Sequence, residues 1–128
     1  MLRTDFSNDA AWEAICAAIL APDAEFGLEA NVTCLSDSAY TGLTTEQVTR
    51  LAPKGPLCFM FIVDQIALTH PEHPILVVDL NREPGQTFRT LPSEVWSIEA
   101  NLSLANIDFF EYADSVDHDG IFRGYRDA

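Results

Sequence analysis

Two uninterrupted apolar runs constrain the fold of this chain more than any other feature. Residues 57–63 read LCFMFIV and residues 75–78 read ILVV, and both runs are rich in β-branched and aromatic side chains. A strand with one face in water alternates apolar and polar residues, whereas a strand covered on both faces reads as a continuous apolar run. The two runs therefore predict central strands of a sheet that other elements cover on both sides.

The N-terminal half supplies further strands and the first covering helices. Residues 2–6 predict a short strand, followed by a helix whose N-cap is Ser7 or Asn8. A second strand is expected at residues 31–35. The sequence TTEQ at residues 44–47 is a capping box, which predicts the start of a short helix.

The C-terminal half predicts a hairpin and the longest helical segment. Residues 86–91 alternate apolar and polar side chains after a Pro-Gly turn, so we expect them to pair with residues 75–78 as an antiparallel edge. Apolar positions then keep helical spacing from Val95 to Phe109 and beyond, with a bend or break. The order β-α-β-α-β-β-β-α predicts one α/β domain over residues 1–128, a mixed sheet of about five strands with helices packed on it.

Size and cysteine usage place the chain among ordinary cytoplasmic domains. With 128 residues, 48% hydrophobic and 21% charged, the chain is long and apolar enough for a packed core. Three cysteines give no full disulfide framework, and no apolar run approaches the roughly 20 residues that cross a bilayer. We expect a soluble cytoplasmic protein without a membrane partner; the sequence leaves the oligomeric state open.

The charge balance is strongly acidic. Twenty aspartates and glutamates against seven lysines and arginines give a formal net charge of −13. Such a chain repels nucleic-acid phosphates, so no nucleic-acid partner is expected. The same field attracts a basic protein and accelerates its encounter with the chain.

The histidine-rich segment LTHPEHPILVVDL, residues 68–80, raises the question of a metal site. His70 and His73 lack the helical His-Glu-x-x-His order, but in a loop they could share a transition metal if a third ligand came from elsewhere. The alternative is a structural turn, in which prolines fix the backbone and the histidines bond to it. No metal is favoured on this pattern.

Aspartates follow four of the expected strands. Asp5, Asp37 and Asp64 would meet at the ligand crevice of a parallel sheet and could hold Mg²⁺ there; Asp79 would join them only if its strand were also parallel. Aspartate is also common wherever a strand gives way to a turn or a helix cap. Gly-rich phosphate loops, Gly-x-Ser-x-Gly and Cys-x-x-Cys are missing from the sequence, so no cofactor is expected.

A further acidic pattern recurs every three residues. Asp108, Glu111, Asp114 and Asp117 would form a stripe on one helix face, and the sequence has no lysine or arginine between Arg89 and Arg123 to answer them. The stripe is either a solvated face or a contact surface for a basic protein.

We interpret the chain as a non-enzymatic, acidic protein-binding domain. Neutralisation of a basic partner, as immunity proteins and antitoxins achieve, is one concrete form. The alternative is a small metal-dependent or small-molecule enzyme that uses the strand-end aspartates or the His70 and His73 loop.

Three segments carry a resemblance to a known family. The segments LTHPEHPILVVDL and FRTLPSEVWSIEANLSLANIDFFEYADSVDHDGIFRG, and also LRTDFSNDAAWEA, resemble a family of uncharacterised small bacterial proteins, a domain of unknown function. The resemblance implies no catalytic residue. It implies that Trp96, Glu99, Asn101, Asn106 and Asp108 belong to a shared segment.

Overall fold

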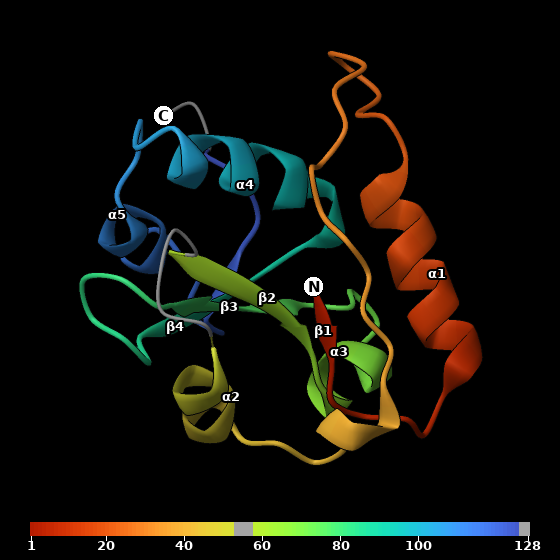
Figure 1. Cartoon of the computed structure of the whole chain (residues 1–128). Helices are drawn as coiled ribbons and strands as arrows, with labels where there is room; N and C mark the ends of the chain where they lie inside the picture. Colours follow the sequence, from red (N-terminus) through yellow and green to blue (C-terminus); the bar gives the residue numbers. More distant parts are fainter. Residues whose placement is uncertain (53–57, 126–128) are drawn as a thin grey trace.

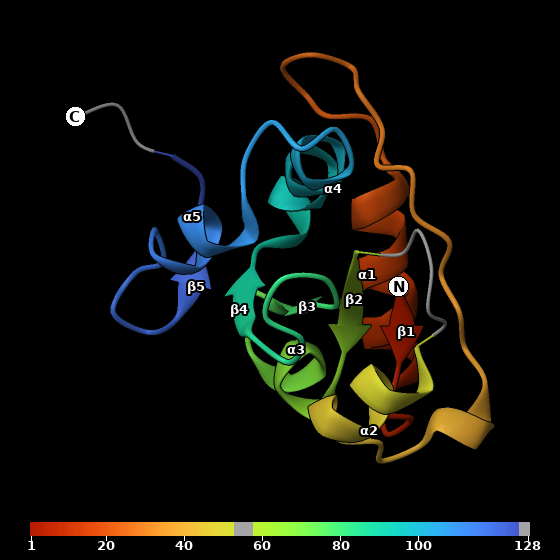
Figure 2. The ribbon, with the colours of Figure 1, turned by 60° about the vertical axis from the view of Figure 1, so that its left-hand side comes forward.

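The sheet is built around the two strands that the apolar runs predict. The computed structural model describes residues 1–52 and 58–125, and Leu57 of the first run lies outside them. Within these residues, five strands form one mixed sheet in the order β1-β2-β3-β4-β5, which is also their order along the chain (Figures 1 and 2; β5 is labelled in Figure 2). The strands are β1 Leu2–Arg3, β2 Phe59–Val63, β3 Ile75–Asp79, β4 Thr87–Thr90 and β5 Ile121–Phe122.

The centre of the sheet is an antiparallel meander of β2, β3 and β4. Phe59 stands opposite Asp79 in the β2–β3 pair, and Ile75 stands opposite Thr90 in the β3–β4 pair. All five residues of β3 are buried, as expected for a strand covered on both faces. The predicted hairpin and the α/β fold class are confirmed.

The two edges of the sheet differ from the prediction. β1 runs parallel to β2, and residues 31–35, expected to form a strand, contribute only one bridge, from Leu35 to Leu2. β1 is only two residues long, so a neighbour beside it cannot form a longer ladder. β5 runs parallel to β4 outside the hairpin, which makes β5 the edge; a two-residue strand has no periodicity to detect.

Helices cover both faces of the sheet (Figures 1 and 2). The larger core lies on the face covered by α1, α3, α4 and α5, and the smaller core lies on the face covered by α2. Asn8 caps α1, where the predicted positions Trp12, Ile15 and Ile19 are buried. The helices are α1 Asp9–Leu20, α2 Thr45–Leu51, α3 Gln65–Thr69, α4 Val95–Ser103 and α5 Phe109–Ala113, with 3-10 turns at Ser38–Tyr40 and Pro92–Glu94.

The C-terminal helical segment is broken. It forms α4 and α5, and α1 with 12 residues is longer than either. Between α4 and α5, Ala105 has φ +56°, in the left-handed region that an α-helix excludes. In the described parts of the chain, no helix has the length and apolar content that a bilayer crossing requires.

Candidate functional site

The histidine loop is a turn fastened to α3. The Glu72 backbone N–H donates to His70 Nδ1 at 3.0 Å, and His73 Nδ1 lies 2.9 Å from the Ala67 carbonyl oxygen. Both imidazoles therefore use one ring nitrogen on local backbone. The carboxylate of Glu72 points to another part of the chain and accepts hydrogen bonds from Arg123 at 2.7 and 3.0 Å.

Arg123 gathers three carboxylates. Its guanidinium donates to Glu72, Asp117 and Asp119, each with a closest distance of 2.7 Å. Hydrogen bonding from Arg123 lowers the pKa of Asp119 to about 2, and it also lowers the pKa of Glu72. This ion-pair network ties the histidine loop to the loop before β5.

The strand-end aspartates cap turns. Side chains of Asp5, Asp37 and Asp79 each accept backbone N–H bonds from the turn that follows, at 2.9 to 3.1 Å. β3, which ends at Asp79, is antiparallel to β2, so this carboxylate lies at the opposite end of the sheet from Asp64. Among residues 1–52 and 58–125, no three His, Cys, Asp or Glu side chains gather as a metal-binding group.

Asp64 has a second role besides capping. It caps α3 by accepting a hydrogen bond from the Ala67 N–H at 3.1 Å. It also accepts hydrogen bonds from the two terminal guanidinium nitrogens of Arg89, at 3.0 and 2.6 Å. The two side chains are 26% and 17% exposed, and they line an open polar hollow of about 420 Å³. This pair fastens α3 to β4.

The four acidic residues expected on one helix face lie in different local structures. Asp108 is the N-cap of α5, and its backbone N–H donates to Glu111 at 2.7 Å in a capping box. Asp114 ends the helix, and Asp117 lies in the following loop on Arg123. The continuous helical stripe is therefore wrong, because α5 is only five residues long.

The arginines of the described structure are all committed to internal ion pairs. Because each one already has a carboxylate, none is left to neutralise Glu111 or Asp114, which are both exposed. Arg82 reaches Asp108 at 3.8 Å, and the side chains of Arg82 and Asp108 are 71% and 42% exposed. The pairs are Arg3–Asp9, Arg50–Glu46, Arg82–Asp108, Arg89–Asp64 and Arg123 with Glu72, Asp117 and Asp119.

Exposed aromatic rings lie beside these two carboxylates. Phe110 is 49% exposed and stands four residues before Asp114, on the same side of α5. Tyr125 is 56% exposed and stacks on Tyr112 with ring centroids 5.7 Å apart. Partial burial raises the pKa of Tyr125, and the nearby charge of Glu111 contributes to the rise. We define the α5 surface as Phe110, Glu111, Asp114 and Tyr125.

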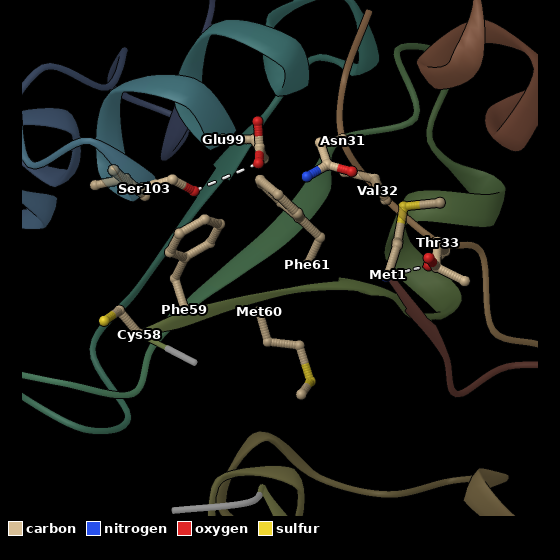
Figure 3. Close-up of a pocket in the computed structure, with 11 residues that line it drawn as sticks. Met1, Asn31, Val32, Thr33, Cys58, Phe59, Met60, Phe61, Glu99 and Ser103 are labelled. Atoms are coloured by element: carbon tan, nitrogen blue, oxygen red, sulfur yellow. Dashed lines mark hydrogen bonds between the residues drawn. The ribbon is translucent and has the colours of Figure 1, made fainter. Parts of the chain in front are cut away.

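A groove lies elsewhere, between β2 and α4 (Figure 3). Its volume is about 380 Å³; Phe59 and Phe61 rise from β2 towards α4, while Met60 points to the other face. Glu99 and Ser103 come from α4, and the Ser103 hydroxyl donates to Glu99 at 3.4 Å. A carboxylate above aromatic rings suits a small molecule with an apolar body and one donor or positive group.

Sequence reasoning missed this groove. Its lining comes from Met1, residues 31–33, residues 58–61 and α4, which only the fold brings together. The one available signal was Glu99, a member of the segment that carries the family resemblance.

Comparison with known protein families gives a match over nearly the whole chain. A family model described as Domain of unknown function (DUF6924) matches residues 1–125, which include the α5 surface and the groove. No curated protein matches the chain.

Proposed function

The chain belongs to this family, a domain of unknown function, and from that premise we propose that it is a cytoplasmic, non-enzymatic acidic domain that binds a basic protein through the α5 surface. Neutralisation of the partner, in the manner of an immunity protein or antitoxin, is the form of action that we favour. The partner supplies lysine or arginine side chains to Glu111 and Asp114.

One observation carries this proposal: two exposed carboxylates, which no arginine among residues 1–52 and 58–125 neutralises, lie beside two half-exposed aromatic rings. Every arginine of the described structure forms an ion pair with another carboxylate. The negative potential that comes from the net charge of −13 is therefore least neutralised around Glu111 and Asp114. Aromatic side chains are enriched at the energetically dominant positions of protein interfaces. An arginine from a partner gains both an ion pair and a cation–π contact at such a surface.

The α5 surface is also held rigidly. The opposite side of the helix buries Phe109 and Tyr112, whose rings pack on Phe88 with centroids 5.0 and 5.8 Å away. A surface that is already ordered loses little conformational entropy on binding.

The test is the association rate with a partner recovered by affinity capture. The double variant Glu111→Gln and Asp114→Asn removes both charges, and glutamine preserves the capping box of α5. We expect association to slow by about three- to tenfold, with a shallower dependence on NaCl concentration, because steering by exposed charges is screened beyond about 8 Å at physiological ionic strength.

A matched control separates this surface from the overall charge. Glu13→Gln with Glu83→Gln removes the same charge at exposed positions of α1 and the β3–β4 turn. If both double variants slow association equally, the global field alone is responsible and the α5 surface is not the contact.

A second candidate is small-molecule binding in the groove beneath α4. Its volume of about 380 Å³ falls within the range of ligand pockets, and it holds a carboxylate above an aromatic floor. A metabolite screen by thermal shift would reveal a ligand, and its stabilising effect should disappear in Glu99→Gln. The enzymatic alternative now rests on this groove, because the strand-end aspartates and the histidines are engaged in caps and turns.

A further inference from the structure

A separate hollow with acidic and aromatic walls lies next to the α5 surface. It has a volume of about 330 Å³ and lies between the loop after α1, the start of α4 and the segment after β5. Figure 2 shows the loop after α1 rising beside α4. The lining of the hollow includes Asp23, Phe26, Glu94, Trp96, Phe122 and Tyr125.

Aromatic rings form two of its walls. On one side Phe26 packs against Trp96, with ring centroids 6.0 Å apart. On the other side Tyr125 packs edge to face on Phe122 at 5.0 Å and stacks on Tyr112 at 5.7 Å. The π-faces of tryptophan and tyrosine attract organic cations, tryptophan most strongly.

Glu94 also lines the hollow. Its carboxylate is partly buried, and in the described parts of the chain it has no hydrogen-bonding or ion-pair partner, not even as the N-cap residue of α4. Burial raises the pKa of Glu94, and the charge of Asp23 raises it further. A partly desolvated carboxylate near a like charge is stabilised when a cation joins it.

Asp23 is held in place by its own turn. It accepts backbone N–H bonds from Glu25 and Phe26 at 3.1 and 2.8 Å. These bonds fix its charge near the hollow and hold Phe26 against Trp96. The cation-attracting groups are therefore positioned before any ligand arrives.

We propose that this hollow receives the guanidinium or ammonium end of one arginine or lysine side chain of the basic protein partner. The proposal rests on the proposed function and supplies its anchor: the cationic end forms an ion pair with Glu94, while its stem lies against Trp96 and Tyr125. A volume near the lower limit for small-molecule sites suits one side chain and not a larger cofactor. Continuity through Tyr125 places the anchor beside the carboxylates that attract the partner.

The first experiment titrates the whole protein with N-acetylarginine amide and follows the two tryptophan indole N–H signals by NMR. Trp96 lines the hollow, while Trp12 is 7% exposed and lies in the core. We expect a saturable shift of the Trp96 signal alone. The neutral citrulline analogue should cause no shift, and Glu94→Gln should weaken arginine binding about tenfold, the loss of roughly 1.4 kcal/mol.

Glu13→Gln is the control, because it removes an exposed carboxylate of α1 that lines neither the hollow nor the groove beneath α4. It should leave arginine binding unchanged. Equal shifts with citrulline, or unchanged affinity in Glu94→Gln with an intact melting curve, would overturn the proposal.

The second experiment separates the anchor from the proposed function. Glu94→Gln should speed dissociation of the protein complex, while the Glu111 and Asp114 double variant mainly slows association. If the double variant slows association and Glu94→Gln leaves dissociation unchanged, the anchor is wrong and the binding surface stands. If arginine amide binds the hollow but the lifetime of the protein complex is the same with Glu94→Gln as with the unchanged protein, the hollow binds a small organic cation. The anchor is then also wrong.

Discussion

At the level of single residues, the arginines act as internal cross-links. The guanidinium of Arg3 is buried, lies over the rings of Phe6 and Trp12 at 4.4 and 5.4 Å, and donates to Asp9 at 2.7 Å. Arg89 and Arg123 similarly connect segments that are distant in sequence. Since these cations hold the fold together, the chain has few left to moderate its acidic exterior.

The Asp64–Arg89 pair gives the first stability prediction. Asp64→Ala removes a helix cap and leaves the mostly buried Arg89 charge without its partner, so we expect a loss of about 2–4 kcal/mol in the free energy of unfolding. Asp37→Ala removes an exposed cap alone and should cost about 1 kcal/mol or less. Urea unfolding of both variants checks this, and equal losses would show that the ion pair adds nothing.

The Arg123 network gives a pH prediction. Hydrogen bonding from Arg123 lowers the pKa of Asp119 from its ordinary value of 3.8 to about 2. A lowered folded-state pKa stabilises the fold above the ordinary value, and that contribution is lost as the pH falls towards about 2. In Arg123→Met, the carboxyl titration of Asp119 followed by NMR should move up towards its ordinary value.

Asp5 is the internal reference for that titration. The largest cause that lowers the pKa of Asp5 is the hydrogen bond from the Ser7 hydroxyl, which lies in a different part of the molecule from Arg123. Its titration should be the same in both proteins. If Asp119 also titrates unchanged in Arg123→Met, another group must be responsible for its low pKa.

At the level of elements, the sequence predicted what is long or chemically distinctive. The two apolar runs identified β2 and β3, Asn8 capped α1 as expected, and the Thr44 capping box marked the start of α2. Prediction missed α3 and β5, because five helical residues and two strand residues are too few to show a period. Residues 31–35 have the composition of a strand but lie beside a partner of only two residues.

The candidate site was predicted only in part for the same reason. A spacing of three suggested one acidic helix face, but the helix that carries Glu111 ends at Ala113. The sequence also could not show which acids Arg82 and Arg123 would reach, because those contacts depend on the packing of loops. Of the predicted acidic stripe, the structure retains the charge and exposure of Glu111 and Asp114.

The break between α4 and α5 can be tested by one substitution at two positions. Ala105 has φ +56°, where glycine lacks the steric cost of a Cβ, so Ala105→Gly should stabilise the fold by about 0.5–1 kcal/mol. Ala100 lies inside α4, so Ala100→Gly should destabilise it by about 1 kcal/mol. Thermal unfolding measures both, and effects of equal sign would contradict the left-handed conformation at Ala105.

At the level of the whole molecule, net charge opposes compactness. With −13 on the chain and the described arginines already paired, like charges repel across the surface. Raising NaCl from low to physiological concentration should raise Tm by a few degrees, because the Debye length shortens to about 8 Å. Sodium and potassium should act equally. A Tm that falls with salt would mean that the ion pairs outweigh the repulsion.

The strand order also predicts the order in which the strands pair during folding. The meander of β2, β3 and β4 joins neighbours along the chain, whereas Leu2 must find Ile62 and Arg89 must find Ile121 across long intervening segments. Closing a longer loop costs more entropy, so the meander should assemble first and both rims should dock late. The rims should also open first in the native state, and their amide protons should exchange with solvent faster than those of β3. The margins of the sheet are thus the places where unfolding begins.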